Sequence, residues 1–119
     1  MTATPNKLKT ISDPPPLLYV RGDVSCLTLP QLAIVGSRNP SPGGKQNAHE
    51  FAKSLSKLGI VITSGMASGI DASAHIGALE ADKPTIAICA QGLIESIQQN
   101  TRPWHIKFQP KALWFLNFV

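Results

Sequence analysis

Gly36, Ser37 and Arg38 form the first of two short segments whose residue types suit anion binding. A glycine lets the backbone approach a ligand closely, and a serine offers a hydroxyl donor. An arginine holds a phosphate through two N–H groups at once. Two ordinary interpretations stay open, because Gly36 also suits a tight turn and Arg38 also suits a solvated surface. The segment predicts phosphate contacts at all three residues.

The second segment, Ser64 to Asp71, repeats this composition just before a helical pattern. Ser64, Gly65 and Gly69 are its candidate phosphate contacts, since the N–H groups at a helix start attract anions. Asp71 suits a helix cap or an acceptor for a ligand hydroxyl, and it fits a structural role better than a catalytic one. His75 lies near the apolar side of the same helix, which favours a structural histidine over a catalytic one.

Other chemistries find little support in the sequence. It contains neither Gly-x-Gly-x-x-Gly nor Gly-x-x-x-x-Gly-Lys, which disfavours dinucleotide and P-loop sites. No nucleophile triad or carboxylate pair stands out, and His49 and His105 have no evident partners. Cys26 and Cys89 lack metal-ligand spacing and are expected to be reduced thiols. We therefore expect no enzyme activity, no cofactor and no metal.

Alternating strands and helices must position the two segments. Strands are predicted at Gln31–Val35, Ile60–Thr63 and Thr85–Cys89, with helices between them. This alternation predicts an α/β fold, a Rossmann-like parallel sheet with flanking helices, and continuous apolar strands suggest cover on both faces. Ligands of such sheets bind at the carboxyl ends of the strands, where both segments would meet.

The helical patterns indicate which residues face the core. The first helix is expected to follow an irregular loop, Asn39–Gly44, and to end at Gly59 in a left-handed cap. Its inward residues are predicted to be Ala48, Phe51, Ala52, Leu55 and Leu58. The second helix is predicted over Ile70–Ala81, with Ile70, Ala74, Ala78 and Leu79 inward.

The 119 residues suit one small domain with two flanking segments. Residues 1–16 are expected to be a flexible leader, residues 17–90 a partial Rossmann-like domain that opens with a strand at Leu17–Val20, and residues 91–119 an atypical tail. The net charge of +4 mildly favours polyanionic partners. Neither a secretory signal nor a membrane span is evident, which predicts a cytoplasmic protein.

Three stretches together resemble the DNA-processing protein A (DprA/Smf) family. They are Ala33–Arg38, Ser64–His75 and Gly77–Leu79, which follow the family's pattern of an apolar strand ending in GSR and then SG-x-A-x-GID-x-x-AH-x-x-AL. The resemblance runs from about Pro15 to Ile88. The family's N-terminal helical module, its C-terminal winged-helix-like module and its glycine-rich loop after the third strand are not visible.

The resemblance implies a non-enzymatic factor that binds single-stranded DNA, self-associates as a homodimer and loads the recombinase A protein during natural transformation. It implies that Gly36, Ser37 and Arg38 line a phosphate pocket, with Ser64, Gly65 and Gly69 in the second loop. One alternative is a nucleotide-cleaving enzyme similar to the phosphoribohydrolases, although their Pro-Gly-Gly-x-Gly-Thr-x-x-Glu segment has no counterpart here. Another alternative is a nonfunctional pseudogene product.

The tail, residues 91–119, holds most of the aromatic residues. The coding sequence can also be read in a shifted frame, in which each new codon joins the last base of one codon, from Ala90 onward, to the first two bases of the next. In that frame the possible codons permit the protein sequence TGLDRIYPAEH, two undetermined residues and LAHQISAKGALVSEF. That string resembles the family's own continuation, which predicts that the tail is out of frame; a natural divergent tail is the alternative. We expect the sheet to lack its fourth strand, which leaves an unpaired edge, low stability and weak DNA binding.

Overall fold

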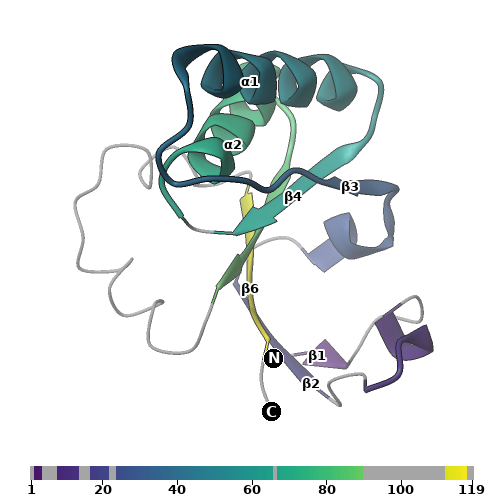
Figure 1. The fold of residues 1–119 in the computed structure, drawn as a ribbon. Helices are drawn as coiled ribbons and strands as arrows, with labels where there is room; N and C mark the ends of the chain where they lie inside the picture. Colours follow the sequence, from purple (N-terminus) through teal and green to yellow (C-terminus); the bar gives the residue numbers. More distant parts are fainter. Residues whose placement is uncertain are drawn as a thin grey trace.

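The residues that the structure describes form one mixed sheet with two helices packed beside it (Figure 1). The computed structural model describes residues 2–3, 8–13, 17–21, 24–65, 67–89 and 112–117. Its strands are β1 (Thr2–Ala3), β2 (Leu17–Arg21), β3 (Gln31–Ala33), β4 (Val61–Gly65), β5 (Thr85–Cys89) and β6 (Ala112–Asn117). The helices are α1 (Pro42–Lys57) and α2 (Ile70–Glu80), and 3₁₀ turns span Leu8–Thr10 and Val24–Thr28. The predicted α/β class is confirmed.

The strands from β3 to β6 run parallel and lie side by side in chain order. Right-handed crossovers between successive neighbours place their helices on the same face of a sheet. Accordingly α1 and α2 pack against each other, as Figure 1 shows. The expectation that helices cover both faces is therefore wrong for the described part of the chain.

Helix α1 begins earlier than the sequence pattern predicted. The hydroxyl of Ser41 accepts a hydrogen bond from the Gly44 N–H at 3.0 Å, and Pro42 follows as the first helical residue. A serine cap followed by proline is a favoured helix start, so the predicted irregular loop up to Gly44 is wrong. The predicted C-cap is confirmed: Gly59 has a φ of +91° and donates to the Ser56 carbonyl, while the Ile60 N–H reaches Leu55.

The core lies between the helices and the middle of the sheet. Ile62 packs there with alanines of both helices, and Ile34 and Leu55 contact this cluster from its edge. Its other members are Ala52, Ala74 and Ala78. Two predicted inward residues are wrong, because Phe51 and Leu58 are 64% and 76% exposed. They lie beside the Ala48–Ala52 face and not on it, while the small Ser56 takes the buried position.

Strand β3 lies at the end of the sheet and differs from the predicted buried strand. It is shorter than Gln31–Val35, and all three of its residues are exposed. An edge strand has a neighbour on one side only, so less of its side-chain surface is covered. Val35, just after β3, is 71% exposed.

The flanking segments add strands that we did not expect. Part of the expected leader forms β1, which pairs antiparallel with β2. The predicted strand at Leu17 is confirmed as β2, and it pairs antiparallel with β6. Because β6 also pairs in parallel with β5, the expected unpaired edge at β5 is wrong. Expectations for residues 90–111 lie outside the described residues.

Candidate anion-binding site at two strand ends

The β3–α1 junction, residues 34–41, presents the first predicted segment to solvent. Gly36, Ser37 and Arg38 are all exposed. The Ser37 hydroxyl accepts a hydrogen bond from the Asn39 N–H at 2.9 Å, which leaves the hydroxyl proton available to an acceptor. Arg38 forms no ion pair with any residue that the structure describes, so its guanidinium is available to an anion.

The start of α1 adds to the positive character of this junction. The first turn of α1 contains no acidic residue, and Lys45 follows directly. Unpaired N–H groups give a helix start a partial positive charge, which neither Asp nor Glu offsets here. Arg38, the start of α1 and Lys45 therefore place positive charge along one short stretch of chain.

The described part of the β4–α2 junction, residues 67–69, is docked against the first one. Gly69 has a φ of +84°, and a Cβ added there would lie 2.3 Å from the Ser37 carbonyl oxygen. The Ile70 N–H donates to the same carbonyl at 3.1 Å. The two predicted segments are therefore neighbours, joined through backbone groups at the carboxyl ends of β3 and β4.

The other two glycines of the predicted site have a role that sequence reasoning missed. A Cβ on Gly36 would lie 2.8 Å from the side chain of Ile70, and a Cβ on Gly65 would lie 2.7 Å from the Asp71 carboxylate. Neither has a positive φ. These glycines make room for the first turn of α2 rather than for a tight turn.

Ser64 and Asp71 lie behind the surface that the sequence analysis assigned to a ligand. Ser64 is 2% exposed, and its hydroxyl donates to the Ile34 carbonyl at 2.5 Å, so it ties β4 to the first junction. Asp71 is 7% exposed and follows the first residue of α2; Gly69 occupies the cap position. One carboxylate oxygen of Asp71, Oδ1, is buried without a hydrogen-bond partner.

His75 is fully buried and links α2 to β4 and β5. Its Nε2 donates to the Gly65 carbonyl at 2.8 Å, and its Nδ1 lies 2.7 Å from the Thr85 hydroxyl, which also lies 2.8 Å from the Ile62 carbonyl. Burial lowers the pKa of His75 to about 4, against the opposing effect of the Gly65 carbonyl. At neutral pH His75 is thus uncharged, and its proton lies on Nε2 because the Gly65 carbonyl can only accept; the Thr85 hydroxyl donates its own proton to the Ile62 carbonyl.

The structure divides the predicted site into an exposed and a supporting part. Gly36, Ser37 and Arg38 are exposed, whereas Ser64, Gly65, Gly69, Asp71 and His75 hold the second junction against the first. Sequence reasoning missed Ser41 and Thr85. The Ser-Pro pair at the start of α1 is a signal for the first; Thr85 has no local signal because its partner is distant in the chain.

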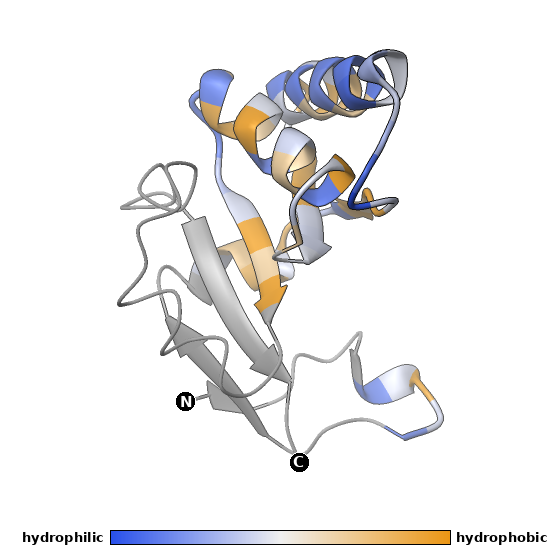
Figure 2. Ribbon diagram, turned by 60° about the vertical axis from the view of Figure 1, so that its left-hand side comes forward, coloured by the Kyte–Doolittle hydropathy of each residue, from blue (hydrophilic) through white to orange (hydrophobic). Residues whose placement is uncertain are grey.

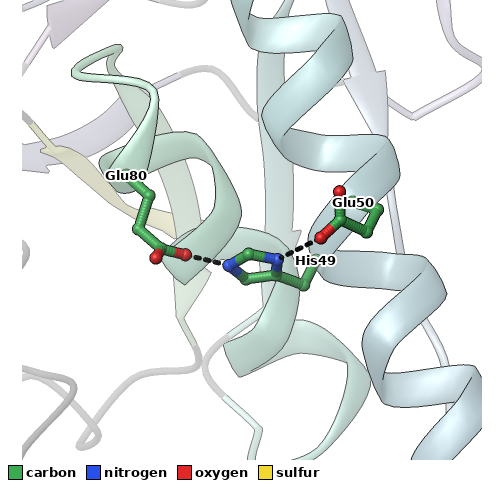
Figure 3. A network of polar contacts seen from close by, with 3 residues as sticks. All are labelled: His49, Glu50 and Glu80. Atoms are coloured by element: carbon green, nitrogen blue, oxygen red, sulfur yellow. Dashed lines mark hydrogen bonds and ion pairs between the residues drawn. The ribbon is translucent and has the colours of Figure 1, made fainter.

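His49 has partners that the sequence analysis did not foresee. Figure 3 shows its ring between two carboxylates, with Nε2 bonded to Glu80 of α2 and Nδ1 3.5 Å from Glu50 of α1.

Across the described residues, no three His, Cys, Asp or Glu side chains gather as a metal site. Cys26 is buried and forms no disulfide bond within the described part of the chain. No helix in the described ranges is both long and apolar enough to cross a bilayer.

Comparison with known proteins places this arrangement in a family. The family model of DNA recombination-mediator protein A matches residues 2–115. DNA processing protein DprA of Bacillus subtilis (strain 168) is 42% identical over 86 residues, which is 71% of this chain and 29% of that protein. Protein Smf of Borreliella burgdorferi is 43% identical over 84 residues, which is 71% of this chain and 27% of that protein. The chain thus spans less than a third of these relatives.

Two solved structures share the fold. DNA processing protein A from Helicobacter pylori, studied for its single-stranded DNA binding mode, superposes with a TM-score of 0.78 at 30% identity over 99% of this chain and 54% of its own. DprA from Streptococcus pneumoniae superposes with a TM-score of 0.79 at 31% identity over 96% of this chain and 40% of its own. With a family match over nearly its whole length and this shared fold, the chain belongs to the DNA recombination-mediator protein A family.

Proposed function

We propose that this chain is a non-enzymatic DNA-processing factor that binds single-stranded DNA through the β3–α1 junction. The observation that carries the proposal is the exposed Ser37–Arg38 pair beside a helix start that lacks acidic residues. A guanidinium, a hydroxyl and a positive helix end together suit one phosphate of a DNA backbone. Gly36 completes this contact surface, and Ser64, Gly65 and Gly69 support it from behind.

The second junction supports the proposal by fixing the first. Ser64 and Ile70 each bond a carbonyl of the β3–α1 junction, and Gly69 packs on the Arg38 backbone. A loop held from behind loses less conformational entropy when it binds, which favours affinity. Asp71 and His75 contribute to this support and touch no DNA in the proposal.

Family membership supports the wider role. The Helicobacter pylori relative has a single-stranded DNA binding mode. By analogy we assign this chain to natural transformation in the cytoplasm, with the recombinase A protein and a second copy of the chain as partners. The enzymatic alternative is weaker, because Pro42, Gly43 and Gly44 form the first turn of α1 and not a catalytic segment.

Replacing Arg38 tests the proposal. Arg38→Ala is expected to weaken binding of a labelled oligothymidylate about tenfold at low salt, because it removes a charge-assisted phosphate contact. The slope of log affinity against log salt concentration should become shallower by about 0.7, the value for one phosphate on a single strand. Fluorescence anisotropy over a range of salt concentrations measures both quantities.

Lys83→Ala is the matched control, since Lys83 is also an exposed cation and lies beyond the far end of α2. It should leave affinity near that of the parent chain. Equal affinity of the parent and Arg38→Ala would reject the site and favour a nonfunctional product. Release of free base from a nucleoside monophosphate would instead favour the phosphoribohydrolase-like enzyme.

We also propose that residues 91–119 are translated out of frame. The support is the length of the family-like string in the shifted frame, where the codons constrain most bases. On this proposal the family's basic contacts after β5 are missing, and DNA binding is weaker than in full-length relatives. The nucleotide sequence across the codons of Ala90 and Gln91 tests this, because an intact frame there contradicts it.

A further inference from the structure

A row of basic residues runs along α1 away from the β3–α1 junction. Lys45, His49, Lys53 and Lys57 follow one another at intervals of four residues, which places them on one slowly winding side of the helix. At 1.5 Å per residue the row is about 18 Å long. Its first member lies in the second turn of α1, close to the proposed phosphate contact. Figure 2 shows hydrophilic residues over much of α1.

The three lysines of this row are available to a partner. Lys45 and Lys57 are exposed and Lys53 is half-buried. None forms an ion pair within the described ranges, whereas His49 engages Glu50, the only acidic residue of α1, and Glu80 from α2 (Figure 3). The nearby carboxylates are thus paired with histidine and not with lysine.

The arrangement is unfavourable for the helix by itself. Lys53 and Lys57 are like charges four residues apart, and such a pair is unfavourable on a helix. Lys45 lies close to the positive end of the helix dipole, where a cation is disfavoured. A bound polyanion would relieve both effects.

We propose that Lys45, Lys53 and Lys57 form a track for the backbone of single-stranded DNA that continues from the β3–α1 junction along α1. The inference rests on the proposed function and extends it from one phosphate to several. Successive phosphates lie against lysines that act as point charges, so the track reads no base sequence. His49 keeps Glu50 and Glu80 occupied beside it.

A double substitution on the full chain tests the track. Lys53→Gln with Lys57→Gln is expected to make the salt slope for a long oligothymidylate shallower by about 1.4, the value for two phosphates on a single strand. Affinity for that oligonucleotide should fall several-fold at low salt. A short oligothymidylate that reaches only the junction should bind as before.

The matched control is Lys9→Gln with Lys83→Gln, which removes the same charge from exposed positions outside α1. An equal loss of affinity and salt slope in the control overturns the track, because the overall positive charge of the protein then explains the effect. An equal loss with the short oligonucleotide, or no loss at all, also overturns it. Arg38→Ala could leave affinity and salt slope unchanged while the α1 variant makes the salt slope shallower. That result would support the track and reject the phosphate contact of the proposed function. Circular dichroism on heating should show no drop in the midpoint of the α1 variant.

Discussion

The two strand–helix junctions share a chain pattern but differ in nearly every physical respect. The β3–α1 junction is exposed and basic, and its helix start is capped by Ser41 with no acid in the first turn. The β4–α2 junction is tightly packed, and α2 carries the buried Asp71 in its first turn. The β3–α1 junction keeps its polar groups available to solvent, whereas the β4–α2 junction uses its polar groups for contacts within the protein.

This difference indicates that two copies of the same strand–helix motif serve different purposes, one for binding and the other for structural support. The α2 helix is buried on most sides, so its first turn must fit between two strand ends, and glycines provide the space. The α1 helix buries only one narrow face and leaves its start open. Substitutions in the second junction should therefore reduce stability, and those in the first should reduce binding.

His75→Ala is expected to produce the largest effect. It removes a fully buried ring and takes the ring donor away from the Gly65 carbonyl, whereas the Thr85 hydroxyl keeps its bond to the Ile62 carbonyl. A loss of about 3 to 5 kcal/mol in the free energy of unfolding follows from the cavity and the lost hydrogen bonds. Urea denaturation measures it. Arg38→Ala, the exposed counterpart, should change stability by less than about 0.5 kcal/mol. Comparable losses of stability in both variants would contradict the assignment of support to one junction and binding to the other.

The pH dependence of stability should be nearly as large. The pKa of His75 is about 4 in the folded chain against 6.5 for the free side chain, so the unfolded chain binds the extra proton between these values. The stabilisation is present above pH 6.5 and is lost as pH falls toward 4, by about 3 kcal/mol in total. Urea denaturation at several pH values measures this slope. His75→Gln should flatten it, and an unchanged slope in that variant would exclude His75 as its source.

A pair of glycine substitutions should give smaller effects of opposite sign. Gly69→Ala introduces a side chain at a positive φ and against the Ser37 carbonyl, which should cost at least about 2 kcal/mol. Gly43→Ala adds a methyl group in the first turn of α1, where nothing lies within 4 Å, and should gain about 0.5 to 1 kcal/mol. Thermal midpoints compare the two. A stable Gly69→Ala chain would show that the junctions are not docked as described.

Local patterns predicted the parts of the fold that depend on local physics. Strand β5 was predicted with its observed bounds, and α2 to within one residue, because a short apolar run and apolar residues at helical spacing are local signals. Gly59 was identified as a cap for the same reason. Phe51 and Leu58 were misassigned because helical periodicity gives a direction but not the width of the buried face.

Long-range packing accounts for what the sequence did not predict. The edge position of β3 depends on strand order, which no local pattern encodes. The expected absence of a strand after β5 was wrong because backbone pairing accepts many apolar sequences, and Ala112–Asn117 is apolar enough. In the site, the proximity of the two segments followed from parallel topology, whereas the docking role of Gly36 and Gly65 required coordinates.

The position of β6 has a consequence for the order of events during synthesis. Among the described strands, β6 lies between β2 and β5, and it leaves the ribosome after both of them. The β3–β5 unit can assemble as it emerges, but β1 and β2 must wait for β6 before they join it. Until then β2 has an open edge, which can pair with strands of other molecules.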